Sequence, residues 1–301
     1  MRISTAFSQS QNLSALLNQQ SRLNDTQLQL SSGQRISKPS DDPAGAAKII
    51  NVSQQIDQLE QYQTNIGAAQ QRLELEDSTL KTANEAVQRL QEIATQSLND
   101  INNANNRKTL AEEVDQLSNQ LLALANTRSA NGEYLFAGFK SSTPPFAASG
   151  NATAPFFSYN GDTNQRLIQI SETRTIADGD PGSTIFGPST AGGSDSIFDV
   201  LRQFSDELKA NSPQVGILDK LKTALNQVSA AQSSVGVRLN ALDSQQTANA
   251  DFILNAQTVL SNTQDLDYAE AISRYNLQTT ALQAAQQTFS RVQRLTLFSE
   301  L

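Results

Sequence analysis

Apolar residues recur every seven positions along the stretch from about residue 43 to 104. A repeat sustained over this length is typical of one long helix with a coiled-coil-like seam. The pattern therefore predicts a helix across this range, with the repeated positions in its core. The row comprises Val52, Leu59, Ile66, Leu73, Leu80, Val87, Ala94 and Ile101.

Two other segments share this periodicity. A second helix is expected after the Asn-rich stretch at 101–106, ending at Asn131-Gly132, because Asn and Gly favour turns. A third apolar pattern runs from 218 to 260 and is expected to fold back against the first helix. A short amphipathic helix at 194–210 would lead into this return segment. The core positions expected from the second and third helices are Leu117, Leu124, Leu225 and Leu239.

The stretch from 139 to 194 has a different composition. Counting Gly138, it holds eight of the 14 Gly of the chain, and it holds five of the eight Pro. The segment FFSYNGDTNQRLIQI (156–170) predicts two strands on either side of an Asn160-Gly161 turn, and DGDPGS (178–183) predicts a further turn. A small β-rich domain is therefore expected between the outgoing and returning helices.

Both ends of the chain carry thinner apolar stripes, separated from the rest by joints. Gly33 can end the first helix, and Asp42 before Pro43 has the pattern of an N-cap followed by a first helical residue. Asp267 and Glu270 have the spacing of a capping box, so a new helix is expected there. The stripes consist of Ile3, Phe7, Leu13, Leu16, Leu23 and Leu30, and of Ile272, Tyr275, Leu282, Ala285, Phe289 and Val292.

These stripes are thin for helices of about thirty residues. Burying about six large side chains contributes on the order of 10–15 kcal/mol, whereas ordering thirty backbone units costs on the order of 30–60 kcal/mol. Helical hydrogen bonds offset only part of the difference. We therefore predict that both ends are disordered in the monomer and form the assembly interface, ordering when neighbouring copies cover them.

Together these patterns predict a mainly α fold, an elongated antiparallel coiled-coil rod with an inserted β-rich domain. The expected division is threefold. Residues 1–40 and 262–301 would form a terminal helical domain, and residues 41–138 and 195–261 a coiled-coil core domain. Residues 139–194 would form the outer β-rich domain.

Composition excludes several classes of chemistry. The 301 residues include no Cys and no His, so disulfides, thiolate or imidazole zinc sites and Ser-His-Asp triads are impossible. The net charge is −8 and no basic cluster is present, which argues against nucleic acid as a partner. The N-terminal segment lacks the apolar core of a cleaved secretory signal, and no aliphatic run is long enough for membrane insertion.

Acidic residues offer the only candidates for catalysis or metal binding. Asp41 and Asp42 stand beside Pro43, where carboxylates cap a helix and favour its dipole. Asp162, Asp178 and Asp180 are too few to form a calcium loop and are expected in ordinary turns. No catalytic, cofactor or metal site is predicted, and the protein is not expected to be an enzyme.

Several motifs resemble one protein family. LSSGQRISKPSDDPAGAAKI (30–49), VQRLQEIATQSLND (87–100) and NGEYLFAGF (131–139) are similar to segments of bacterial flagellins and their hook-associated relatives. The C-terminal stretch from Asp265 is similar as well. The likeness covers roughly residues 1–140 and 215–301 and keeps the order of the motifs. Within the family, NGEYLFAGF and the final LFSEL favour an adaptor between hook and filament.

This resemblance implies the following organisation and partners. The terminal helices would line a central channel, and the β-rich domain would face outward. Export would proceed through the flagellar type III apparatus without a cleaved signal, placing the protein outside the cell at the hook–filament junction. The implied partners are further copies in a ring-like layer, the first hook-associated protein, flagellin, and an export chaperone on the C-terminal helix.

Two alternatives remain open. The chain could be a flagellin that forms the filament itself. Alternatively, the inserted domain could bind a surface or glycan through Phe156, Phe157 and Tyr159, although a role in a small core explains these aromatic residues as well.

Overall fold

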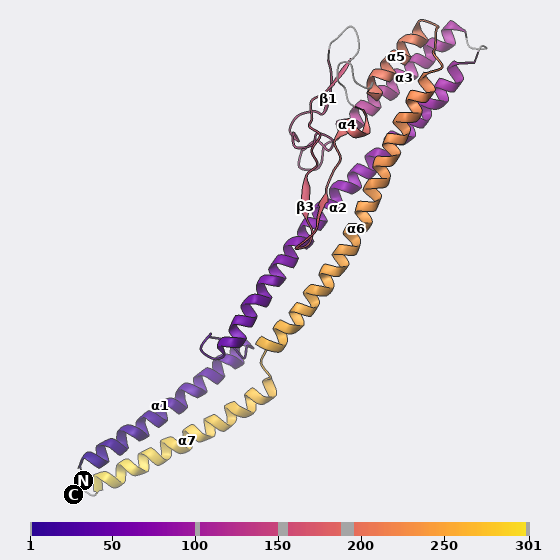
Figure 1. Ribbon diagram of the computed structural model, residues 1–301. Coiled ribbons are helices and arrows are strands. Elements are labelled where there is room, and N and C mark those ends of the chain that lie inside the picture. Colours follow the sequence, from indigo (N-terminus) through magenta and orange to yellow (C-terminus); the bar gives the residue numbers. More distant parts are fainter. Residues whose placement is uncertain (1, 100–102, 150–155, 188–195, 299–301) are drawn as a thin grey trace. The chain divides into compact units, whose positions relative to one another are not determined.

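The computed structural model describes residues 2–99, 103–149, 156–187 and 196–298, without the side chains of residues 2–6, 8 and 292–298 (Figure 1). The described chain is mainly helical with two small antiparallel sheets, which confirms the predicted fold class. None of the described helices combines the length and the apolar character needed to cross a membrane. The helices are α1 (Arg2–Ser32), α2 (Pro43–Ser97), α3 (Ala104–Ala125), α4 (Gly182–Ile185), α5 (Ile197–Lys209), α6 (Ile217–Gln264) and α7 (Tyr268–Phe298).

The chain divides into two compact units. The terminal unit comprises residues 1–58 and 251–301, and the middle unit comprises residues 59–250. Both boundaries fall inside helices, α2 and α6, whereas the predicted boundaries at 40/41 and 261/262 lie close to the joints between helices. Residues 139–194 belong to the same compact unit as the flanking helices. That they form a domain of their own stays a prediction.

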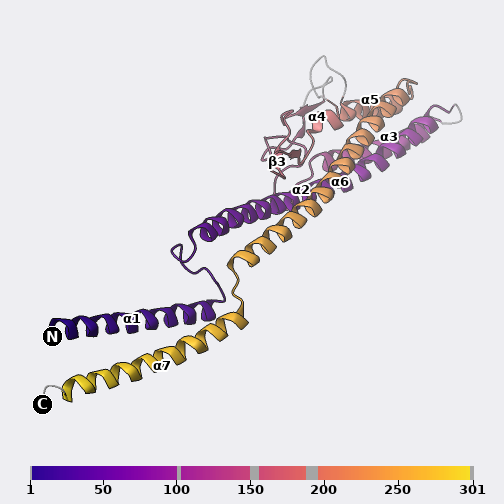
Figure 2. The ribbon, with the colours of Figure 1, turned by 60° about the horizontal axis from the view of Figure 1, so that its bottom comes forward.

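In the middle unit, α2 and α6 lie side by side in antiparallel directions (Figures 1 and 2). Near one end Gln63 Nε2 donates to the Gln246 carbonyl at 2.8 Å, and further along Asn84 Nδ2 donates to Ser229 Oγ at 3.1 Å. Residue numbers rise along one helix while they fall along the other. The two periodic segments therefore meet in space as the sequence predicts.

The predicted core positions differ in how deeply they are buried. Ile66, Leu73, Leu80 and Val87 are completely buried in the main hydrophobic cluster. In α6 and α3 the completely buried positions include Leu221, Val228, Val235, Leu242 and Leu121, which belong to the same predicted apolar patterns. The half-buried predicted positions are Val52, Leu59, Leu117, Leu124, Leu225 and Leu239.

The two connections around α3 differ from the prediction. Helix α2 ends at Ser97, before the Asn-rich stretch, and Asn103 caps α3 by accepting a hydrogen bond from the Asn106 backbone at 2.9 Å. Helix α3 ends at Ala125 rather than at Asn131-Gly132. The reason is Asn126, whose side chain accepts from the Phe146 nitrogen at 3.0 Å and donates to the Phe146 carbonyl at 2.9 Å.

The inserted segment contains two separate hairpins. Strand β1 (Phe146–Ala148) pairs with β2 (Phe157–Tyr159), and β3 (Leu167–Gln169) pairs with β4 (Thr175–Ala177). The strands predicted on either side of Asn160-Gly161 exist, and each of them pairs with a different strand. The Asp162 nitrogen donates to the Ala137 carbonyl at 3.1 Å, so the intervening turn packs against the segment that follows α3.

An aromatic cluster joins this insert to the helices. Phe146 packs against Tyr159 from β2 and Phe198 from α5, with ring centroids 5.1 and 4.9 Å apart. Phe186 packs edge-on against Phe136 at 5.5 Å. Among the described residues, these aromatic side chains belong to, or pack against, the same hydrophobic cluster as the α2 core. The predicted helix at 194–210 is confirmed as α5 within the described residues.

The predicted joint in the terminal unit is confirmed. Gly33 ends α1 with φ of +72°, and a Cβ there would stand 2.8 Å from the Tyr268 hydroxyl oxygen. Helix α2 begins at Pro43, and the Gly45 nitrogen donates to Asp42 Oδ1 at 2.9 Å. The geometry is that of an N-cap with Pro at the first helical position.

Two other acidic residues at the joints accept backbone hydrogen bonds, Asp41 in a turn and Asp267 at a helix start. Asp41 Oδ2 accepts from the Lys38 nitrogen at 3.0 Å, which accounts for this carboxylate without a catalytic role. Asp267 Oδ1 accepts from the nitrogens of Ala269 and Glu270 at 2.9 and 3.2 Å, where α7 begins. The helix start predicted at this position is confirmed.

Replacing Leu73 with Asp is expected to unfold the middle unit. The side chain is completely buried, and an uncompensated charge there should lower the free energy of unfolding by more than about 4 kcal/mol. Thermal unfolding followed by circular dichroism measures the effect. The matched control is Gln71→Asp, which places the same charge at an exposed position of α2 and should change stability by about 0.5 kcal/mol or less. Equal melting of both variants would contradict the assignment of Leu73 to the core.

Candidate assembly surface

The terminal unit pairs α1 with α7 in antiparallel directions (Figure 2). Gln19 Nε2 donates to the Gln278 carbonyl at 3.5 Å, and Arg274 Nη2 donates to Gln29 Oε1 at 3.4 Å. At the joints the two connecting segments exchange backbone hydrogen bonds, of which Arg35 N to Gln264 O is 2.7 Å long. These contacts fix the register of the two helices.

Each of the two helices contributes a row with seven-residue spacing to the seam between them. Leu16, Leu23 and Leu30 of α1 are half-buried. The corresponding row of α7, together with Ala285, is half-buried too and consists of Tyr275, Leu282 and Phe289. In contrast to the middle unit, this seam leaves its large side chains partly in contact with water.

The remaining predicted interface residues do not join this seam. Phe7, Leu13 and Ile272 are exposed, at 65%, 49% and 50% of their surface. The side chains of Ile3 and Val292 lie outside the described residues. The structure therefore places seven of the twelve predicted positions in the seam between α1 and α7 and leaves three on the surface.

A second apolar stripe on α1 was overlooked by the sequence analysis. Leu17 and Leu28 are 57% and 51% exposed, and with Leu13 they lie within about 60° of one another around the helix. We call Leu13, Leu17 and Leu28 the outer stripe. The signal in the sequence was the spacing of four and then eleven residues, which correspond to about one and three helical turns. On α7, Leu277 is 73% exposed and was overlooked as well.

A groove of about 400 Å³ lies between α1 and α7. Ala15, Ala281 and Ala285 contribute little volume to its walls, and Leu16 and Phe289 line it beside them. Two helices with small residues at their interface cannot fill the space between them. Its walls are mixed, because they also include Asn12, Gln19, Arg22 and Thr288. The outer stripe adds apolar side chains that are exposed in the described part of the chain.

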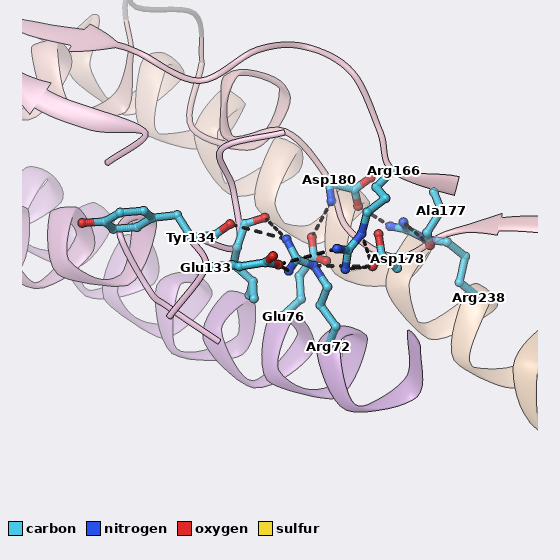
Figure 3. Close-up of polar contacts among 10 residues, drawn as sticks. Arg72, Glu76, Glu133, Tyr134, Arg166, Ala177, Asp178, Asp180 and Arg238 are labelled. Carbon is cyan, nitrogen blue, oxygen red and sulfur yellow. Dashed lines mark hydrogen bonds and ion pairs between the residues drawn. The ribbon is translucent and has the colours of Figure 1, made fainter. Parts of the chain in front are cut away.

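The middle unit contains a buried cluster of charged side chains (Figure 3). Two of its members are Asp178 and Asp180, for which the sequence predicts ordinary turns. Asp178 accepts from Arg166 Nε at 2.8 Å, and its side chain is only 1% exposed. Asp180 forms an ion pair with Arg238 of α6 and accepts from Gln165 Nε2 at 2.6 Å. The structure places both residues in an irregular segment after β4, with each carboxylate folded inward onto a guanidinium group.

Asp162 behaves as predicted. Its Oδ1 accepts from the nitrogens of Phe139 and Asn164 at 3.1 and 2.9 Å, which stabilises a turn. In the part of the chain that the structure describes, no group of three or more acidic side chains could hold a metal ion.

Glu76 of α2 lies next to this cluster and is completely buried. Burial, followed by the neighbouring charge of Asp180, raises the pKa of Glu76 to about 8. Its Oε1 accepts from the Asp180 nitrogen at 3.2 Å, while Oε2 has no hydrogen-bond partner among the described residues. The sequence contains a signal for this residue. Glu76 lies seven residues after Ala69 and seven before Ala83, so it stands in a row of otherwise apolar positions.

The aromatic residues considered for surface binding are mostly engaged inside the insert. Phe157 packs against Phe198 with centroids 5.5 Å apart, and the Tyr159 hydroxyl donates to the Phe136 carbonyl at 3.0 Å. Phe156 is half-buried, with the Arg202 guanidinium 5.9 Å from its ring centroid. These three residues therefore do not form an open aromatic surface.

Two family models match the chain. Residues 3–141 match the bacterial flagellin N-terminal helical region, and residues 218–299 match the bacterial flagellin C-terminal helical region. The flagellar hook-associated protein 3 of Salmonella typhimurium is 32% identical over 99% of this chain and 99% of its own. A flagellin of Clostridium tyrobutyricum is 33% identical over 37% of this chain and 29% of its own.

A solved structure has the same fold. The flagellar junction protein FlgL of Legionella pneumophila superimposes with a TM-score of 0.59 and 22% identity, covering 72% of this chain and 99% of its own. The motifs at both ends, the helical pairs and the full-length likeness agree with one another. The chain belongs to the flagellin-related family of flagellar hook-associated protein 3.

Proposed function

We propose that this chain is a structural, non-enzymatic adaptor of the bacterial flagellum that joins the hook to the flagellin filament. The observation that carries the proposal is the likeness to a hook-associated protein 3 over 99% of both chains, which includes the insert. Filament proteins match either a part of this chain, 37% in the flagellin of Clostridium tyrobutyricum, or a larger part at lower identity, 24% over 82% of it in flagellin FlaB2 of Treponema pallidum. The alternative of a filament subunit is therefore less well supported.

The proposed mechanism is assembly through the terminal helices. Hydrophobic association is driven by apolar area removed from water, and the terminal unit retains such area on the outer stripe and in the groove. Neighbouring copies in a ring-like layer would cover these surfaces. Above and below this layer, the first hook-associated protein and flagellin would form the remaining contacts.

Export is the second part of the proposal. The protein would reach the outside of the cell through the flagellar type III apparatus, without cleavage of a signal peptide. An export chaperone would hold the C-terminal helix before export, when the apolar residues of α7 have no neighbour. The absence of Cys from the sequence suits passage in an unfolded state, because no disulfide can form.

A surface-binding role of the insert is the weaker alternative. Phe157 and Tyr159 serve the aromatic core, as their contacts with Phe198 and Phe136 indicate.

Deleting the gene should separate the adaptor from the filament subunit. Loss of an adaptor is expected to leave hooks without filaments and to release flagellin into the medium, because the subunits have nothing to build on. Electron microscopy of the cells and immunoblots of the medium measure both effects. Cells that lose the filament protein itself would contradict the adaptor role.

Leu282→Asp should prevent junction formation without unfolding the middle unit. The residue is half-buried in the seam of the terminal unit, where a charge opposes packing. Secretion and the thermal unfolding of the middle unit should remain unchanged, while motility is lost. Gln283→Asp adds the same charge at an exposed neighbouring position and should still assemble.

Leu17→Asp probes the outer stripe in the same assay. Since Leu17 is 57% exposed, the change should leave the seam intact yet abolish assembly. A Leu17→Asp variant that forms normal junctions would remove the outer stripe from the proposed interface.

Hydrogen exchange tests the predicted disorder of the free ends. In a dilute monomer, backbone amides of α1 and α7 should exchange close to the rate of an unstructured peptide, while those around Leu73 and Leu80 stay protected. Strong protection at Leu16 or Leu282 in the monomer would contradict the prediction.

A further inference from the structure

The buried charged cluster connects three parts of the middle unit (Figure 3). Arg72 and Glu76 come from α2, Arg238 comes from α6, and Asp178 and Asp180 come from the segment that follows β4. Arg238 also donates to the Ala177 carbonyl at 3.2 Å, and Arg72 donates to the Leu135 carbonyl at 3.2 Å. The cluster therefore holds the insert against both long helices.

The charges of this cluster balance only in one protonation state. Three guanidinium groups, those of Arg72, Arg166 and Arg238, face three carboxylates that are paired with them. Arg72 contacts Glu133 at 3.2 Å and Asp178 at 3.8 Å, Arg166 contacts Asp178, and Arg238 contacts Asp180. The carboxylate of Glu76 is a fourth. The charges of Arg238 and Arg72 lower its pKa, but burial and the charge of Asp180 raise it by more, so the net shift is upward.

Glu76 is also cut off from solvent and only partly hydrogen-bonded. It is completely buried, its Oε1 accepts one backbone hydrogen bond, and its Oε2 has no partner in the described part of the chain. The charge of Asp180 lies next to it. An ionised carboxylate in this position would be both desolvated and repelled, whereas the protonated form is neutral.

We propose that Glu76 carries a proton when the insert is docked, and that loss of this proton loosens the insert from α2 and α6. The device is a pH-sensitive clamp, independent of the adaptor role proposed above. The clamp is closed in neutral and acidic solution and weakened in alkaline solution. The segment that responds is residues 165–180, because it supplies Arg166, Asp178 and Asp180.

The direction of the pH dependence follows from linkage. The pKa of Glu76 is about 8 in the folded chain, against 4.5 as the ordinary value. Between these values the folded state holds a proton that the unfolded chain has released. The free energy of unfolding of the middle unit therefore falls as pH rises from 4.5 to about 8, and levels off above that.

Glu76→Gln tests the clamp, because Gln has the shape and neutrality of the protonated carboxyl. Hydrogen exchange of the full chain is measured at pH 6 and pH 9 and corrected for the intrinsic rate. In the wild type, protection of the amides in 165–180 should fall on the order of a hundredfold between pH 6 and pH 9, because each of the two pH units between 6 and the pKa of about 8 contributes about a factor of ten and little is added above 8. In Glu76→Gln it should not fall. Glu74→Gln, at an exposed position of the same helix, should behave as the wild type does.

Equal loss of protection in Glu76→Gln and the wild type would overturn the proposal. If Glu76→Gln does not fold, the wild-type carboxyl group can be titrated directly by carbon NMR of Glu-labelled protein. A buried carboxyl that titrates near pH 8 supports the clamp, whereas titration of every Glu carboxyl near 4.5 overturns it. Neither outcome depends on flagellar assembly, so failure of the clamp and failure of the adaptor role are distinguishable.

Discussion

The seven-residue apolar repeat of α2 is the constraint on which the middle unit depends. Ile66, Leu73, Leu80 and Val87 are completely buried, and α3, α5, α6 and the insert contribute to the same hydrophobic cluster. A single helix cannot bury its own stripe, so every element of this unit is arranged to cover it. The insert completes this core: Phe146 and Phe198 join its aromatic side chains to those of the helices.

Polar residues along this core determine alignment. Asn84 and Gln63 bond to α6, while Asn249 Nδ2 donates to the Ile170 carbonyl of the insert at 3.1 Å. A buried polar group is costly without a partner, so these hydrogen bonds favour one register of the helices and one placement of the insert. Glu76 belongs to this set, but in the proposed clamp its charge is neutralised by a proton instead of a counterion.

The terminal unit follows the same helical periodicity with a different balance of burial. Its seam residues are half-buried, its groove is unfilled, and the outer stripe faces water. Most of the hydrophobic stabilisation therefore resides in the middle unit. A subunit that assembles through its ends requires this arrangement, since apolar area already buried within the monomer could not contribute to association.

The sequence by itself determined the long helices and α5, the joints at Gly33 and Asp267, the position of the insert and the family, because heptad spacing, capping residues and local motifs act over a few neighbouring residues. The short helix α4 starts inside the stretch 178–183, for which the sequence predicts a turn. The sequence could not determine the ends of α2 and α3, the pairing of β2 with β1, or which apolar stripe of α1 meets α7. Asn126 stops α3 through a contact with Phe146, twenty residues away. Glu76 is about a hundred residues away from Asp178 and Asp180 along the chain. Only tertiary packing brings these charges together and buries them. Local chemistry thus fixed the elements, and long-range burial decided their partners.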